Sequence, residues 1–147
     1  MSWLHWALLS AAFAGLTAVL AKVGVEKVDS NLAMAIRTAV VLLPAWGLAL
    51  WSSSQPLSAI PPRTWLFLIL SGLATGASWV CYFRALQLGD AASVAPVDKL
   101  SVVVAMILAA LFLHERLTWQ HWLGGALIVS GTVVIALAPK AGPGAGG

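Results

Sequence analysis

The chain has few charged residues for its length. Charged side chains make up 9% of its 147 residues, whereas 61% are hydrophobic, and the mean hydropathy is +0.94. A soluble domain carries about 25% charged residues, which cover its core. This composition excludes a soluble globular protein and predicts an integral membrane protein. Its spans should be helices, so we expect an all-α integral membrane fold.

Basic clusters, cysteine pairs and metal-ligand patterns are also missing. The net charge of +3 comes from scattered residues, so nucleic acid is not expected as a partner. The one cysteine, Cys81, can form neither an intrachain disulfide nor a thiolate metal site, and we expect a buried, unreactive thiol. His5, His114 and His121 share no helical face, so we predict no metal site and no cofactor. No nucleophile and base pair occurs at one depth, so an enzyme is not expected.

What the chain does contain is a series of apolar stretches. A membrane-spanning helix needs about 20 apolar residues, because each adds about 1.5 Å against a bilayer core of about 30 Å. Five stretches meet this length, at residues 3–21, 32–51, 64–83, 91–113 and 119–138. Together they predict one transmembrane domain over residues 1–139. Between them we expect a cap for the second helix at Asp29, Ser30 or Asn31 and a polar turn at residues 84–90. The Gly/Pro-rich tail, residues 140–147, is expected to be disordered.

The fourth stretch carries the strongest functional signal. Pro96, Asp98 and Lys99 lie inside it. A charge at membrane depth costs about 2.5 to 3.5 kcal/mol even on a lenient scale, so this pair needs a partner or a wet cavity. Pro96 leaves a backbone carbonyl unpaired in the same turn, and only protein or cavity water can satisfy it there.

Counting residues from the loops places five side chains at one depth. Helices one and three end, and helices two and four begin, on the same side of the membrane. Arg37, Trp79, Tyr82, Asp98 and Lys99 then share a depth of roughly 8 to 12 Å. We predict that they form a substrate site, because two cations against one carboxylate leave a positive charge that an anion or cavity water must meet. The alternative is a structural pin, in which Asp98 pairs with Arg37 while Lys99 reaches the headgroups.

The first apolar stretch has one face of small residues. Ser10, Ala14, Thr17, Ala18 and Ala21 fall on it. Such a face suits either close helix packing, which we favour, or a cavity wall.

Loop charges give a weak orientation signal. One side of the membrane holds Lys22, Lys27, Arg84 and Lys140, and the other holds Arg63 and Arg116. Because cytoplasmic loops are richer in Lys and Arg, this bias favours the N-terminus outside and the C-terminus inside. The margin is small enough for insertion in both directions.

Two segments resemble a known transporter family. FRALQLGDAASVAPVDKLSVV and the following LFLHERLT are similar to the EamA domain of the drug/metabolite transporter superfamily, in particular to half-size bacterial and archaeal members. Pro96 and Glu115 fall on the family's recurring proline and glutamate, and we expect both to be structural. The resemblance covers nearly the whole chain. It implies one five-helix EamA repeat, a multi-pass protein of the cell (inner or plasma) membrane, and transport of small metabolites.

The family resemblance also implies a partner. Full-length relatives carry two inverted repeats around a cavity, so one repeat needs a second copy or a half-size homologue. The last apolar stretch resembles the dimerising helix of small multidrug resistance transporters, since Gly124 and Gly131 stand two turns apart. Those transporters keep a glutamate in their first helix, and this chain has no acidic residue there.

These observations predict a half-size secondary transporter that works as a dimer. Its substrate is expected to be a small anionic or zwitterionic metabolite, contacted by Arg37 and Lys99, with Asp98 as counter-ion or proton carrier. Trp79 and Tyr82 are expected to line the cavity, and membrane lipids surround the helices. The alternatives are a non-transporting membrane scaffold or subunit, and an exporter like the small multidrug resistance proteins.

Overall fold

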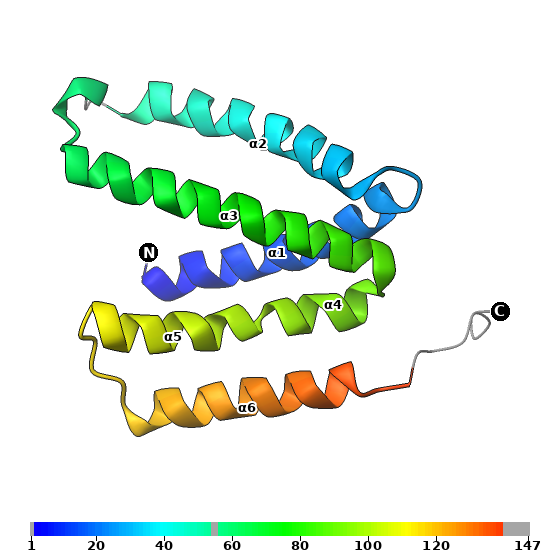
Figure 1. The fold of residues 1–147 in the computed structure, drawn as a ribbon. Coiled ribbons are helices and arrows are strands. Elements are labelled where there is room, and N and C mark those ends of the chain that lie inside the picture. Colours follow the sequence, from blue (N-terminus) through cyan, green and yellow to red (C-terminus); the bar gives the residue numbers. More distant parts are fainter. Residues whose placement is uncertain (1, 54–55, 140–147) are drawn as a thin grey trace. The chain divides into compact units, whose positions relative to one another are not determined.

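The structure is a computed structural model that describes residues 2–53 and 56–139 (Figure 1). The predicted tail, residues 140–147, lies outside the described residues. Helices account for the regular structure of the described part, with no strand in it. Five segments are long and apolar enough to cross a membrane, which confirms the all-α, five-span prediction. They are α1 (Trp3–Val25), α2 (Ser30–Ser52), α3 (Pro62–Leu88), α4 with α5 (Ala91–Phe112) and α6 (Trp119–Ala136), and a short 3-10 turn, η1 (Leu57–Ala59), precedes α3.

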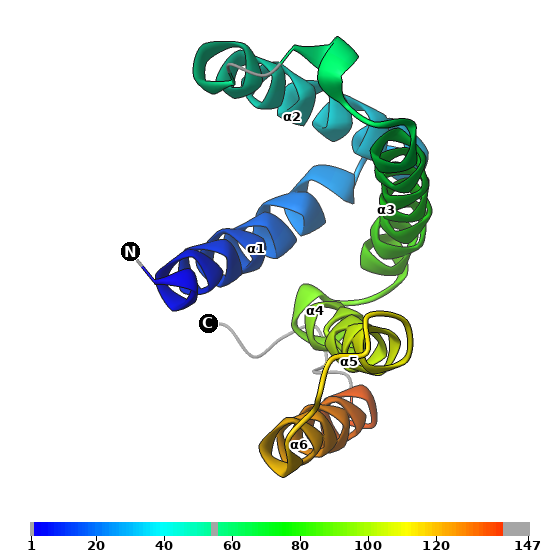
Figure 2. The ribbon, with the colours of Figure 1, turned by 90° about the vertical axis from the view of Figure 1, so that its left-hand side faces the viewer.

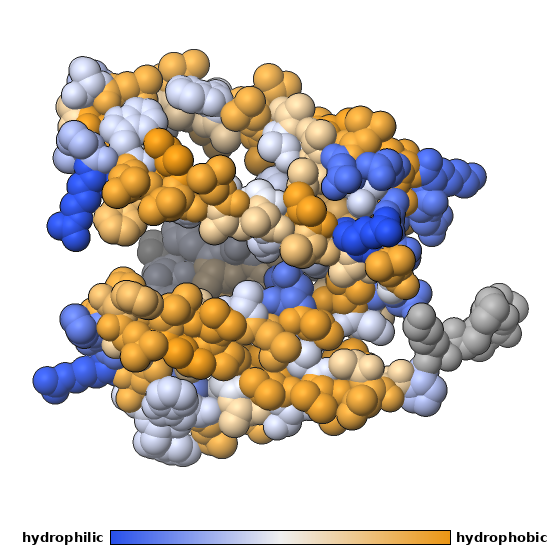
Figure 3. Space-filling view, viewed as in Figure 1, coloured by the Kyte–Doolittle hydropathy of each residue, from blue (hydrophilic) through white to orange (hydrophobic). Residues whose placement is uncertain are grey.

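The chain forms two compact units, and each is described by itself. Unit 1 is Met1–Gly89 and unit 2 is Asp90–Gly147. The helix surfaces are largely apolar, and hydrophilic residues gather near the helix ends (Figure 3). Apolar flanks with polar ends suit helices whose sides face lipid.

In unit 1, α3 packs against both α1 and α2. The helices α1 and α2 diverge from the short loop that joins them (Figure 2). Near that loop lie the buried apolar side chains Val25, Phe83 and Leu86. The predicted cap of α2 is confirmed, because the Asp29 carboxylate accepts hydrogen bonds from the backbone N–H groups of Asn31 and Leu32. The core of unit 1 therefore sits at its loop end.

The end of α3 differs from the prediction. Residues 84–90 were expected to form a turn, but α3 continues to Leu88. The Gln87 amide Nε2 donates to the carbonyl of Val28 at 2.9 Å, and Lys22 Nζ donates to the carbonyls of Leu86 at 2.8 Å and Gly89 at 3.0 Å. These bonds hold the extra helical turn against the end of α1 and the α1–α2 loop. The polar residues at positions 84–88 therefore do not mark the end of the helix.

In unit 2 the fourth span is divided. The helix α4 (Ala91–Asp98) ends at Asp98 and α5 (Leu100–Phe112) begins at Leu100, whereas a single helix was expected over residues 91–113. Pro96 lacks a backbone N–H, and the Lys99 N–H donates to the Pro96 carbonyl at 3.0 Å in a tighter turn. Figure 1 shows α4 and α5 following one another through this break.

Candidate binding site

Arg37 on α2 lies over aromatic rings of α3. Its guanidinium carbon is 4.4 Å from the centroid of the Trp79 ring and 5.8 Å from that of Phe83. Trp79 and Phe83 are four residues apart, so both rings lie on one face of α3. Arg37 and Trp79 therefore lie next to each other, as expected, and a cation–π contact joins them.

No carboxylate among the described residues forms an ion pair with Arg37. Stacking uses the face of the guanidinium and leaves its N–H groups, which point outward in the plane, available to an acceptor. Arg37 is only partly exposed and lies two helical turns inside α2. An arginine in this state favours an anion near its edge.

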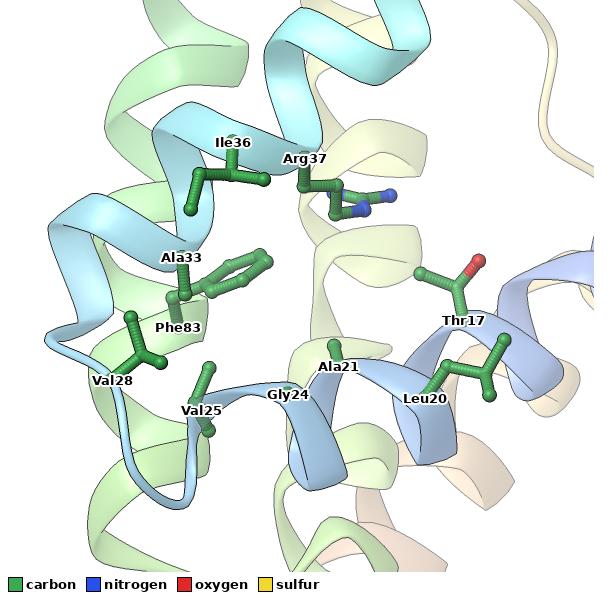
Figure 4. A pocket seen from close by; sticks show the side chains of 10 residues that line it. All are labelled: Thr17, Leu20, Ala21, Gly24, Val25, Val28, Ala33, Ile36, Arg37 and Phe83. Carbon is green, nitrogen blue, oxygen red and sulfur yellow. The ribbon is translucent and has the colours of Figure 1, made fainter.

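A pocket of about 370 Å³ opens beside this arginine. Figure 4 shows the ten residues around it, contributed by α1, the α1–α2 loop, α2 and α3. Arg37 supplies the one charge of this lining and Thr17 the one other polar side chain. The remaining residues are Leu20, Ala21, Gly24, Val25, Val28, Ala33, Ile36 and Phe83.

Sequence reasoning found part of this pocket. Thr17 and Ala21 lie on the small-residue face of the first helix, which was expected to pack or to line a cavity, and here both line the pocket. Gly24 and Phe83 were missed. Gly24 continues the face three residues after Ala21, and Phe83 lies one turn after Trp79, so helical spacing was the available signal.

Tyr82 and Trp79 were expected to line the cavity. Neither belongs to the described lining of this pocket. Trp79 does, however, stack against Arg37, which lines the pocket. The Tyr82 ring meets the Phe83 ring edge to face, with centroids 6.3 Å apart. Their contact with substrate stays a prediction.

Asp98 and Lys99 lie at the break between α4 and α5. Lys99 Nζ is 3.2 Å from Asp98 Oδ2, and the two side chains are 55% and 33% exposed. This ion pair is local to unit 2. The predicted pair between Asp98 and Arg37 would join the two units and stays a prediction, as do the substrate contacts of both residues.

Pro96 is tied to α6 by a hydroxyl group. The Thr132 side chain, which is 6% exposed, donates to the Pro96 carbonyl at 3.4 Å. The Pro96 carbonyl thus accepts from the Lys99 N–H and from the Thr132 hydroxyl, both inside unit 2. Sequence reasoning missed Thr132, whose hydroxyl is one of many in the apolar stretches.

Glu115 follows the end of α5. His114 adopts the left-handed conformation with φ 55°, which histidine tolerates better than most residues, and the Glu115 N–H donates to the Ala109 carbonyl at 3.3 Å. The backbone of Glu115 therefore helps to close the helix. A structural role for its carboxylate stays a prediction.

The glycines of α6 face different surroundings. A Cβ atom added at Gly125 would meet Met106 Cε at 3.6 Å, so Gly125 packs against α5. Cβ atoms added at Gly124 and Gly131 would meet no atom within 4 Å among the described residues. Those two positions have room for a partner backbone, and their role in dimerisation stays a prediction.

Cys81 corrects another expectation. It was predicted to be buried, but it is exposed on α3. The prediction failed because the apolar character of a span does not distinguish its lipid-facing side from the interior. Within residues 2–53 and 56–139, no group of three or more His, Cys, Asp or Glu side chains could hold a metal ion.

Comparison with known proteins agrees with this all-helical membrane architecture. The EamA-like transporter family matches residues 1–137. A protein of Sinorhizobium sp, described as an uncharacterized transporter in the cobO 3' region, is 58% identical over 137 residues, which are 92% of this chain and 97% of that protein. No solved structure matches the chain. The five membrane-spanning segments and the match over nearly all of their length lead to one conclusion: the chain belongs to the EamA-like transporter family.

Proposed function

We propose that the protein is a half-size secondary transporter that works as a dimer in the cell (inner or plasma) membrane. Its substrate is a small anionic or zwitterionic metabolite. A similar protein, 97% of which aligns with this chain, is described as an uncharacterized transporter, which supports a role in transport. Arg37 binds the anionic group, Lys99 assists, and Asp98 acts as counter-ion or proton carrier.

The observation that carries this proposal is the arginine beside the pocket. Arg37 is stacked on Trp79 at 4.4 Å, has no ion pair with a described carboxylate, and lines a cavity of about 370 Å³. Ligand pockets span about 300 to 1,000 Å³, so this one has the size for a small metabolite. A partly exposed cation that forms no ion pair with a described carboxylate provides both affinity and charge selection.

The test is ligand-dependent thermal stability of the purified protein across a panel of anionic, zwitterionic and cationic metabolites. A ligand that binds the folded state raises its melting temperature. We expect anions or zwitterions to do so, and Arg37→Gln to abolish the shift. Arg63→Gln is the matched control, because Arg63 also lies over an aromatic ring, Phe67 at 5.8 Å, but does not line the pocket. Stabilisation by cations alone, or equal loss in both variants, would contradict the proposal.

A second candidate is a membrane scaffold that does not transport. It is favoured by the ion pair between Asp98 and Lys99, which neutralises two of the three charges without a ligand. A scaffold predicts that Arg37, Asp98 and Lys99 can be exchanged together for apolar residues without loss of function in the cell. A transporter predicts that this triple variant no longer moves substrate in proteoliposomes.

A further inference from the structure

We propose that the unit 1 pocket selects monoanions that carry an apolar body, with the anionic group on Arg37 and Thr17 and the apolar body along the α1 wall. This inference rests on the proposed function and narrows its substrate class. It concerns the pocket within unit 1, whose lining comes from α1, the α1–α2 loop, α2 and α3.

The charge of the pocket admits one anionic group. Arg37 is the one charged residue of the lining, and its N–H groups have no carboxylate partner among the described residues. A carboxylate accepts two parallel N–H bonds from such a guanidinium. A second anionic group on the ligand would meet no further cation of this lining.

Thr17 provides the second polar contact. The hydroxyls of Thr38, Thr75 and Ser130 donate to carbonyls four residues earlier in their own helices. In the described part of the chain Thr17 makes no such bond, so its hydroxyl remains available to a ligand. Figure 4 shows the Arg37 side chain extending from α2 toward the side of the pocket where Thr17 lies.

The rest of the lining selects against polar ligands. Leucine, valine, isoleucine, alanine and phenylalanine side chains cannot bond hydroxyl or ammonium groups, so each such group on a ligand would be desolvated without compensation. An ammonium group would also be placed in the same pocket as a guanidinium. The pocket therefore disfavours sugar acids and zwitterions relative to apolar carboxylates of the same length.

Gly24 sets the length of ligand that fits. It lies two turns beyond Thr17 on the wall formed by α1, and a Cβ atom added there would meet no atom within 4 Å. A larger side chain would therefore point into free space at the wall and shorten the cavity. Gly15 on the same helix has equally free surroundings but does not line the pocket, which makes it a matched control.

The probes are six-carbon compounds that differ in polarity. Hexanoate, norleucine and gluconate are compared by calorimetric binding to the full-length protein in nanodiscs, with propionate as the short carboxylate. We expect hexanoate to bind at least about tenfold more tightly than norleucine or gluconate, since unsatisfied polar groups cost at least that much. Equal or tighter binding of norleucine or gluconate would overturn the proposal.

The variants test each part of the lining. Arg37→Gln should abolish hexanoate binding, and Thr17→Val should weaken it several-fold. Gly24→Leu should lower the hexanoate affinity by about tenfold or more relative to propionate, while Gly15→Leu leaves that ratio unchanged. Thr17→Val, which preserves side-chain shape, tests the site if Gly24→Leu does not fold. An unchanged hexanoate-to-propionate ratio in folded Gly24→Leu, or unchanged hexanoate binding in Thr17→Val, would overturn the inference.

Two further measurements separate this inference from its alternatives. An anionic lipid also joins an anionic group to an apolar body, so hexanoate binding is compared in phosphatidylcholine and phosphatidylglycerol nanodiscs. Equal binding is expected, and its loss in phosphatidylglycerol would assign the pocket to lipid and refute a free ligand. Proteoliposome uptake of hexanoate tests the proposed function separately. Selective binding without uptake would refute transport but not the pocket, whereas Arg37-dependent uptake of a polar anion would refute only the apolar selection.

Discussion

Thr132 is the residue that ties α6 to the break in the fourth span. Its buried hydroxyl donates to the Pro96 carbonyl at 3.4 Å. Thr132→Val keeps the shape of the side chain but removes the donor, so we expect the free energy of unfolding to fall by about 0.5 to 1.5 kcal/mol. Unfolding in detergent micelles measures this change.

The control for Thr132 lies on the same helix. The Ser130 hydroxyl is exposed and donates to Ala126 of its own helix at 2.8 Å, so Ser130→Ala should leave stability nearly unchanged. Equal effects of the two substitutions would show that the bond to Pro96 does not contribute.

At the scale of residues, sequence reasoning located Arg37 and Trp79 but not the side chains around them. Their common depth follows from loop positions and the rise of a helix, which depend only on counting. The pocket residues depend on the rotation of each helix about its axis. In a soluble protein the polar face reveals that rotation, but here lipid and interior are both apolar. For this reason Gly24 and Phe83 were missed as pocket residues, and Cys81 was wrongly predicted to be buried.

The break between α4 and α5 has a testable effect on stability and on transport. Discontinuous helices place backbone groups and charges at transporter binding sites, and this break carries Asp98 and Lys99. Pro96→Ala should restore a helical hydrogen bond and raise stability by up to about 3 kcal/mol, while transport falls because the charged pair is repositioned. Melting temperature and proteoliposome uptake are measured on the same preparation.

Pro44 is the matched control for this substitution. It lies inside α2, which continues through it from Ser30 to Ser52. Pro44→Ala should therefore raise stability without lowering transport. If both alanine variants transport normally, the break at Pro96 has no role in transport.

The helix α6 carries the predicted dimer contact. Gly124→Leu with Gly131→Leu should convert dimer to monomer, because leucine side chains prevent close backbone approach at that face. The fold of unit 2 should survive, since a Cβ atom at either position meets nothing within 4 Å. Light scattering of the purified protein measures the mass, and Gly47→Leu on α2 is the control glycine. A dimer that persists in the double variant would place the interface elsewhere.

At the scale of elements, the number of spans could be predicted but several of their ends could not. Hydropathy records where the chain becomes polar, whereas a helix ends where its hydrogen bonds end. Arg84 and Gln87 are polar and yet continue α3, with Arg84 Nη1 donating to Gln87 Oε1 at 3.0 Å. Conversely, Asp98 and Lys99 sit within an apolar stretch where the helix is interrupted.

For the whole molecule, the alternative to a substrate site is an ion pair between Arg37 and Asp98, which would connect the two units. Asp98→Asn should then lower both stability and transport, and Arg37→Gln in that background should recover stability, because each single change strands a charge. Arg63→Gln is the control, since Arg63 lies over the Phe67 ring and forms no ion pair with a described carboxylate. Additive losses in the Arg37 and Asp98 double variant, measured by unfolding, would argue against contact.

Orientation is the second property of the whole molecule. Two copies that reproduce an inverted-repeat transporter must be antiparallel, which requires insertion in both directions or a homologue of opposite bias. The four-to-two distribution of Lys and Arg is weak, so we expect reporters fused to the C-terminus to give a mixed signal, and a few added lysines to fix one direction. A wholly cytoplasmic C-terminus together with transport by the lone chain would refute the antiparallel homodimer.

The double hydrogen bond of Lys22 bears on when that orientation is decided. In the folded unit its ammonium is occupied by the carbonyls of Leu86 and Gly89 at the end of α3. During synthesis α1 emerges before α3 exists, so Lys22 is then a free cation that counts toward the direction of insertion. Folding then places this charge, in the last turn of α1, against the carbonyls at the end of α3. The Lys22 charge thus acts on the direction of insertion before α3 supplies the carbonyls that it bonds in the folded unit.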